Sequence, residues 1–319
     1  MKNAVYLVMG CLLLTGPVRE AGAAKCLFIN SYHQGYAWSD GVERGLRSVL
    51  EGRCELRQFD MDTKRNKGKA YKERIGLAAK LLIESWQPDV VITADDNAAK
   101  YVIKPYFRDT ETPFVFGGVN WTAKEYGFPC KNVTGIVEVA PIKPMLKRAM
   151  SISNGDRLFY LGADTLTENK NLARFQAAAK SLDVSLNFKL VSTVDDWLTA
   201  YSEIQSSHDV VIMGSHSGIR DWQARTDHVK AEVAKAARKL SVTNHGWMMP
   251  FAIFGMTKVP EEHGEWTAQA ALAILGGTPP TEIPVVANRK WDLWVNDQLL
   301  AASGINLPRT LRRRAKSVE

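Results

Sequence analysis

The feature that most constrains the fold of this chain is an alternation of short apolar runs with longer segments of helical periodicity. An apolar run of strand length begins at Cys26, and the segment after it carries Val42, Leu46 and Leu50 at helical spacing. Several further run-and-helix pairs follow along the chain. Such an alternation is typical of βαβ units, in which helices connect parallel strands. The sequence therefore predicts an α/β protein built on parallel sheets.

The alternation forms two successive units that meet near Pro141. In the first unit we expect strands at 26–30, 55–61, 90–93, 114–116 and 133–137, and helices at 40–50, 69–86 and 97–107. In the second we expect strands at 158–161, 188–191 and 210–213, and helices at 145–151, 167–182, 195–206 and 222–240. Two such units in 319 residues predict two doubly wound lobes that face each other across a cleft.

The last third of the chain is less regular. We expect strand material that crosses between the lobes at 242–256, and helices at 262–275 and 297–303. The N-terminal lobe is then 24–139 with about 254–283, and the C-terminal lobe is 140–253 with about 284–308, the two being joined by hinge strands. Basic side chains crowd residues 309–319, which we interpret as a solvated basic tail.

The N-terminus has the pattern of a secretory signal peptide. Lys2 precedes an apolar stretch at 4–14, and Ala21-Gly22-Ala23 supplies small residues for cleavage near Ala23/Ala24. The stretch is too short to span a bilayer, so we expect residues 1–23 to be removed and the mature protein to be periplasmic. Lipid attachment at Cys11 is an alternative.

Three cysteines follow the expected cleavage site. Cys26 and Cys54 open what look like neighbouring strands, so we expect them to form a disulfide in an oxidising compartment, with Cys130 left over. No spacing of cysteines and histidines resembles a zinc site, and we expect no metal.

The loop from Ser31 to Asp40 is the leading candidate for a binding site. Ligands of open parallel sheets bind beyond the carboxyl ends of the strands, and this loop follows the first strand. It brings Tyr32, Tyr36 and Trp38 there, with Ser39 as the expected N-cap of the next helix. The alternative is that these aromatic side chains merely cover the edge of the sheet.

Polar residues also follow other predicted strands. The candidates are Asp96 and Asn97 after the third strand, Asn120 after Gly117-Gly118, Glu138 after the fifth strand, Asp164 after the first strand of the second unit, and His216 after a later one. Any one of them has an ordinary structural explanation, whereas their repeated position at strand ends indicates a shared site.

The motifs of several enzyme classes are missing from the sequence. Residues 213–218 contain Ser215 and His216 but lack the Gly-x-Ser-x-Gly spacing of many hydrolases. A secreted hydrolase therefore stays an alternative that no motif supports. There is no Walker loop and no Gly-x-Gly-x-x-Gly after a strand, which disfavours nucleotide cofactors, and no charge stripe typical of a nucleic-acid reader. We therefore expect neither an enzyme, nor a cofactor, nor a nucleic-acid partner.

Several motifs together resemble the ABC-transporter substrate-binding family of the type I periplasmic-binding-protein fold. They are Ser31-Tyr32-His33-x-Gly35-Tyr36-x-Trp38-Ser39, Met61-Asp62-Thr63-Lys64-Arg65, Asp95-Asp96-Asn97-Ala98 and Val115-Phe116-Gly117-Gly118-Val119-Asn120. The pattern is also similar to periplasmic sensor domains of histidine kinases and diguanylate cyclases.

The resemblance implies a two-lobed clamshell that holds a small solute, and better understood relatives bind amino acids. Matching motif positions implies first-lobe contacts from Tyr32, Tyr36, Trp38, Asp96, Asn97 and Asn120, and contacts from Glu138, Asp164 and His216 on the hinge and second lobe. The expected partner of this monomer is a membrane permease, or alternatively a membrane-bound sensor protein. From carboxylates and aromatic rings we expect an amino acid or a similar zwitterionic or cationic metabolite.

Overall fold

The computed structural model describes residues 23–318. The predicted signal peptide lies, apart from Ala23, outside the described residues, and so does Cys11. Within 23–318, no helix is both long enough and apolar enough to cross a membrane.

The first lobe is built on a six-stranded sheet in which every strand pair is parallel. The strands, in spatial order, are β11 (Val286–Ala287), β5 (Val133–Glu138), β4 (Phe114–Asn120), β3 (Val90–Ala94), β1 (Lys25–Asn30) and β2 (Glu55–Asp60). Its helices are α1 (Ala37–Leu50), α2 (Lys69–Trp86), α3 (Asp95–Ala98), which continues as a π-helical segment (Ala99–Phe107), and α8 (Pro260–Leu275).

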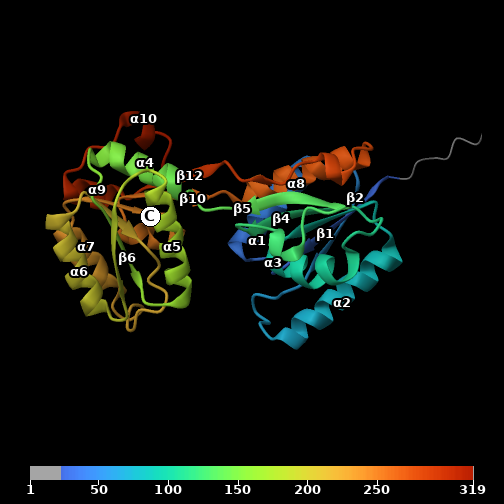
Figure 1. Cartoon of the computed structure of the whole chain (residues 1–319), viewed down its shortest axis with the longest axis horizontal. Helices are drawn as coiled ribbons and strands as arrows, with labels where there is room; N and C mark the ends of the chain where they lie inside the picture. The colour runs from blue at the N-terminus through green and yellow to red at the C-terminus, as the bar shows by residue number, and fades with distance from the viewer. Residues whose placement is uncertain (1–22, 319) are drawn as a thin grey trace, which may run out of the picture.

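Alternate residues of β1 and β3 enter two different apolar cores of the first lobe. Phe28 and Ile92 pack with residues of α1 and α8, whereas Leu27 and Val91 pack with residues of α2 and the π-helical segment. Because both faces of the sheet are covered by helices, its central strands are predominantly apolar on both faces. This is the doubly wound arrangement that the sequence predicted, and Figure 1 shows the helices around the sheet.

The second lobe contains a seven-stranded sheet that is parallel except for one pair, β10 with β12. The strands, in spatial order, are β13 (Lys316–Ser317), β12 (Trp291–Val295), β10 (Phe254–Lys258), β9 (Leu240–Thr243), β8 (Val210–Met213), β6 (Leu158–Ala163) and β7 (Leu186–Val191). The helices are α4 (Ile142–Ser153), α5 (Leu166–Lys180), α6 (Val194–Ser207), α7 (Thr226–Ala236), α9 (Asp297–Ser303) and α10 (Arg309–Arg312).

The chain passes between the two sheets three times, after β5, after β10 and after β11. Two of the expected lobe boundaries are wrong. We assigned residues from 254 to the first lobe, but β10 pairs with β9 and β12 and belongs to the second sheet. We assigned residues from 284 to the second lobe, but β11 pairs with β5. A short apolar run predicts a strand, but it does not predict which sheet the strand joins, because that depends on pairing with strands distant in sequence.

The region 242–256 does not cross between the lobes as expected. It holds the end of β9, a 3₁₀ turn (Gly246–Phe251) and the start of β10, all within the second lobe. The helix expected at 222–240 is also shorter, because α7 ends at Ala236 and Leu240 opens β9.

The C-terminal residues are not a free basic tail. They form α10 and β13, and β13 pairs in parallel with β12. Arg312 forms an ion pair with Asp297 at 2.9 Å, and Lys316 forms one with Asp292 at 2.7 Å. Nearby carboxylates therefore hold two of the basic residues that the sequence placed in solvent.

Helix α1 begins earlier than predicted. Tyr36 occupies the capping position, and the Ser39 hydroxyl instead donates a hydrogen bond to Asn30 Oδ1 at 3.1 Å. Ser39 therefore ties the helix to the end of β1 from inside its first turn, and it is not the N-cap.

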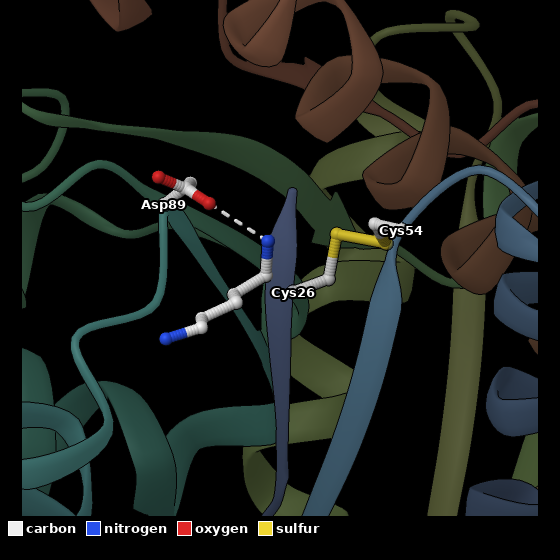
Figure 2. Close-up of a disulfide and its surroundings, with 4 residues drawn as sticks. Cys26, Cys54 and Asp89 are labelled. Atoms are coloured by element: carbon white, nitrogen blue, oxygen red, sulfur yellow. Dashed lines mark hydrogen bonds between the residues drawn. A yellow bond between two sulfur atoms is a disulfide. The ribbon is translucent and has the colours of Figure 1, made fainter. Parts of the chain in front are cut away.

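The predicted disulfide between Cys26 and Cys54 is confirmed, and Cys130 is free. The bond joins the start of β1 to the residue before β2, as Figure 2 shows, with the two Cα atoms 6.0 Å apart. Beside it, the backbone N–H of Lys25 donates to Asp89 Oδ2 at 2.7 Å. The first strand is thus fixed at its N-terminal end, opposite the end that carries the aromatic loop.

Candidate functional site

A pocket of about 490 Å³ lies between the two lobes, at the carboxyl ends of several strands. The first lobe contributes residues that follow β1, β2 and β3 and the last residues of β4 and β5, while the second contributes the loop after β9 and the end of β10. Its wall consists of Tyr32, Tyr36, Ala37, Trp38, Lys64, Asp95, Asn120, Glu138, Asn244, His245, Gly246, Trp247, Thr257, Lys258 and Pro260.

Tyr32, Tyr36 and Trp38 form the aromatic wall of the first lobe. The rings of Tyr32 and Tyr36 meet edge to face, with centroids 5.4 Å apart. The ammonium group of Lys64, from the loop after β2, lies 4.9 Å from the Tyr32 ring centroid and 4.7 Å from that of Tyr36. A cation at this range is attracted to the negative faces of aromatic rings, so the wall pairs apolar surface with a positive charge.

Trp38 is held by the buried carboxyl group of Asp95. The indole N–H donates to Asp95 Oδ1 at 3.0 Å, and Asp95 is only 3% exposed. Burial, followed by the charges of Glu138 and Asp96, raises the pKa of Asp95 well above its usual range. This environment favours the protonated acid, because desolvation penalises the charged form of a carboxyl group.

Gly118 and His263 complete the support beneath Trp38. Gly118 adopts a φ of +71°, and an added Cβ there would lie 3.1 Å from Asp95 Oδ1. Its backbone N–H donates to His263 Nδ1 at 3.2 Å, while the His263 ring lies 5.4 Å from that of Trp38. Burial, followed by the charge of Lys258, lowers the pKa of His263 to about 3, so this imidazole is neutral. Gly117 and Gly118 therefore serve the packing of Asp95 and His263.

Glu138 and Lys258 form an ion pair where the chain passes between the lobes. Glu138 ends β5 in the first sheet and is 5% exposed, and Lys258 ends β10 in the second. Burial raises the pKa of Glu138, and the neighbouring ammonium group opposes that rise. Lys258 Nζ also lies 5.3 Å from the Trp38 ring centroid. The ion pair thus connects both sheets with the aromatic wall.

Trp121 makes a second contact between the lobes. It follows Asn120 at the end of β4, and its ring packs against the apolar core of the second lobe. The guanidinium group of Arg174, on α5, lies 4.2 Å from its ring centroid. The lobes therefore touch through an aromatic–cation contact as well as through the connecting strands.

The opposite wall of the pocket comes from the loop after β9. His245 and Trp247 stack with ring centroids 4.5 Å apart, and the indole N–H of Trp247 donates to Ser215 Oγ at 3.3 Å. Trp247 is nevertheless 55% exposed. Burial, with the charges of Lys258 and His216, lowers the pKa of His245 to about 4, so this wall presents neutral rings.

Five of the nine predicted contact residues line this pocket, namely Tyr32, Tyr36, Trp38, Asn120 and Glu138. That they contact a ligand stays a prediction. Asp96 and Asn97 are not in the wall. The Asp96 carboxylate accepts hydrogen bonds from Asn120 Nδ2 at 2.6 Å and from the Tyr126 hydroxyl at 2.8 Å. The Asn97 amide donates to Thr63 Oγ1 at 2.8 Å. Both side chains therefore support neighbouring loops.

Asp164 and His216 also lie outside the pocket wall. Asp164 is exposed after β6. The His216 ring stacks on Trp222, with centroids 4.7 Å apart, and its pKa is lowered by burial. Ser215 accepts hydrogen bonds from Trp247 and from the backbone N–H of Ser217. In the described part of the chain, the Ser215 hydroxyl has no hydrogen bond to a histidine that could act as its base.

Sequence reasoning missed several residues of the wall. Lys64 lies in the motif that follows β2, but nothing in the motif shows that its side chain folds over Tyr32. Asn244, His245 and Trp247 lie within four residues of the sequence, and this clustering of polar and aromatic side chains was the available signal. Lys258 was missed because β10 was placed in the other lobe. Across residues 23–318, no three histidine, cysteine, aspartate or glutamate side chains are grouped to hold a metal ion.

Comparison with solved structures identifies the architecture. A ligand-free, open substrate-binding protein with adhesive properties from Clostridium difficile matches with a TM-score of 0.75 and 14% sequence identity, over 93% of this chain and 99% of that one. The fold is that of a type I periplasmic binding protein. An ABC domain in complex with L-Trp from Streptococcus pneumonia matches over 93% of this chain and 100% of that one, with a TM-score of 0.59 and 12% identity.

A periplasmic ribose ABC transporter protein from Conexibacter woesei has the same fold, with a TM-score of 0.54 and 12% identity over 93% of this chain and 99% of that one. No family model matches the sequence, and comparison with curated proteins finds no match. At these identities the likeness establishes the fold and leaves the ligand to be argued from the pocket.

Proposed function

We propose that this protein is an extracytoplasmic solute-binding protein that captures a small polar or aromatic metabolite and delivers it to the permease of an ABC transporter. The observation that supports this most directly is the pocket itself. Its wall draws on both lobes, and the aromatic side chains of Tyr32, Trp38 and Trp247 lie on opposite sides of it. Two solved neighbours, an L-Trp complex and a ribose ABC transporter protein, agree with this role.

Closure of the lobes explains how such a pocket holds a solute. A ligand that touches both walls makes more contacts in the shut form, and it shifts the balance between open and closed forms by that difference in affinity. In this proposal the lobes move about the three connections between the sheets. Binding without chemical change is sufficient for this function, and we propose no catalytic residue.

The location outside the cytoplasm is part of the proposal. The disulfide between Cys26 and Cys54 supports it, because such bonds persist mainly in oxidising compartments. The predicted signal peptide agrees with export. The same closed form could instead be presented to a membrane-bound sensor, which is the alternative partner.

The chemical class of solute that the pocket supports is broader than the sequence suggested. The expectation of an amino acid rested partly on Asp96 as the group that takes an ammonium, and that carboxylate accepts hydrogen bonds from Asn120 and Tyr126 outside the wall. The aromatic residues still favour a solute with a flat or apolar part. We therefore retain a polar or aromatic metabolite of about amino-acid size.

Thermal unfolding of the mature protein against amino acids, amines, aromatic acids, sugars and nucleobases tests this function. A solute at one hundred times its dissociation constant adds ~2.7 kcal/mol to the apparent free energy of unfolding, a rise of ~5 °C in Tm for a chain of this size. Conversion of a candidate solute into product would contradict the proposal, and so would a flat response to the whole panel.

A matched pair of variants tests whether the solute binds in this pocket. Trp247→Ala removes an exposed ring from the wall, while Phe188→Ala removes an exposed ring from β7, far from it. Loss of one stacked ring weakens binding ~10-fold, which halves the stabilisation at the same solute concentration. We expect this loss in Trp247→Ala alone. An equal response of both variants would place the solute elsewhere.

A further inference from the structure

The pocket wall contains four ionisable side chains that are charged at neutral pH in water, namely Lys64, Asp95, Glu138 and Lys258. Their sum favours one charge for a bound solute, because closure of the lobes removes these groups from water and an ion left unpaired there is penalised. Two are basic and two are acidic, so the balance depends on the protonation of the two carboxyl groups.

Asp95 contributes no negative charge. It is buried, its Oδ1 accepts from the Trp38 indole, and its Oδ2 has no hydrogen-bond partner among the described residues. A carboxylate in such a place would leave a full charge unsolvated, with one neutral donor to stabilise it. The protonated acid is the form that this site tolerates.

Glu138 and Lys258 contribute either zero or one positive charge. If both are ionised, as their contact indicates, their charges cancel. If burial keeps the proton on Glu138, the Lys258 ammonium remains positive. Neither case leaves a free negative group for a cationic solute.

Lys64 adds one uncompensated positive charge. It forms no ion pair with any carboxylate within residues 23–318, and its ammonium lies over the rings of Tyr32 and Tyr36. Two acidic residues outside the wall are already engaged. Asp62 forms an ion pair with Arg65 at 2.7 Å, and Asp96 accepts two hydrogen bonds. The wall is therefore net positive for either state of Glu138.

The positive groups lie on the same aromatic surface. Lys64 Nζ is over the two tyrosine rings and Lys258 Nζ is over Trp38, while neutral His245 and exposed Trp247 form the facing wall. We infer that the solute is a planar aromatic or heteroaromatic acid whose ring is held between these walls and whose anionic group pairs with Lys64. This inference rests on the proposed function and specifies its substrate class.

Three indole compounds with one ring system separate the contributions of charge. Indole-3-propionate carries only a carboxylate, tryptamine carries only an ammonium, and L-tryptophan carries both. Calorimetric titration of the mature protein with each compound, and with 3-phenylpropionate, phenethylamine and L-phenylalanine as a smaller-ring series, compares them directly. We expect at least one of the two acids to bind tenfold or more tightly than its matched amine and its matched amino acid.

A variant pair tests the role of Lys64. Lys64→Gln removes the charge, and Lys67→Gln removes an exposed charge from the same loop, outside the wall. We expect Lys64→Gln to weaken binding of the acid about tenfold, since a charge-assisted hydrogen bond is lost, and Lys67→Gln to bind as the wild type does. Equal Tm values without solute establish that both variants are folded.

Three results would overturn the inference. One is tighter binding of an amine or amino acid than of its acid, which would mean that a wall carboxylate such as Glu138 is available to an ammonium group. Another is unchanged affinity in Lys64→Gln. The third is failure of both acids while a sugar or nucleobase from the wider panel binds, which leaves the solute-binding function standing. Failure of every solute would contradict the proposed function itself.

Discussion

Replacing Lys258 with methionine should destabilise the protein because it leaves the buried carboxylate of Glu138 without its partner. Two unit charges about 4 Å apart interact by ~4 kcal/mol at an effective dielectric constant of about 20. Removing one member of a buried pair costs ~3–5 kcal/mol, since the remaining charge stays desolvated. Glu138 is almost fully buried, but the Lys258 side chain is 30% exposed, so we expect the lower end of that range.

The cost should depend on pH in a defined direction. In the wild type burial raises the pKa of Glu138 and Lys258 opposes the rise, so the folded-state pKa lies further above the unfolded value in Lys258→Met. When a carboxyl group has a raised pKa in the folded state, the free energy of unfolding falls as pH increases from the unfolded-state pKa to the folded-state pKa. Urea unfolding should therefore show a loss of ~3 kcal/mol at pH 8 and a clearly smaller loss at pH 5.

Two further variants make this prediction refutable. Glu138→Gln combined with Lys258→Met replaces the pair by a neutral one and should recover more than half of the lost stability at pH 8. Lys170→Met, at an exposed position of α5, controls for the loss of a surface charge. The reasoning is wrong if the single variant loses the same stability at both pH values, or if the double variant recovers none of it.

Two further predictions concern the stability of the first lobe. In Gly264→Ala the added Cβ would lie 1.9 Å from the backbone oxygen of Val42, so α8 must move away from α1. Despite a gain of ~1 kcal/mol in helix propensity, we expect urea unfolding to show a net loss of at least ~2 kcal/mol in the free energy of unfolding. The control Gly246→Ala, where nothing lies within 4 Å of the added Cβ, should lose almost none. Reduction of the disulfide, whose cysteines are 28 residues apart, should lower the free energy of unfolding by ~3.5 kcal/mol, and an unchanged urea midpoint in reducing buffer would contradict that.

The sequence was most informative where local pattern alone decides the structure. The apolar run of β1 and its helical continuation specify a strand–loop–helix unit, and the loop between them must then lie at the carboxyl end of the sheet. Tyr32, Tyr36 and Trp38 were placed in the pocket wall on that basis. The pairing of Cys26 with Cys54 followed from the same adjacency of strands.

The sequence was least informative where two adjacent residues of the same type occupy different environments. Asp95 and Asp96 are adjacent and chemically identical, yet Asp95 enters the pocket wall and Asp96 turns toward Tyr126. The backbone of Asp95, with a φ of +68°, determines which carboxyl group points inward. Gly118 on the next strand leaves room for this carboxyl group, since an added Cβ there would lie 3.1 Å from Asp95 Oδ1, and no local pattern in the sequence reveals that contact.

Lys258 shows that the sequence also does not specify which sheet a strand joins. A short apolar run ending in lysine has no property that specifies its sheet, and β10 joins the second lobe through pairing with β9 and β12. Once the strand is placed there, its last residue necessarily lies near the junction of the lobes, beside Glu138.

The position of α8 in the chain has a consequence for biosynthesis. In Figure 1 this orange helix lies in the first lobe beside α1, although most of the second lobe separates them in sequence. Val42 and Leu46 pack in one core with Ala268 and Ala271, so one flank of the first sheet stays uncovered until residues 260–275 have emerged. A nascent chain can finish the early strands of this lobe, but it cannot close the lobe until it is almost complete. An exposed apolar flank of that kind is what chaperones recognise.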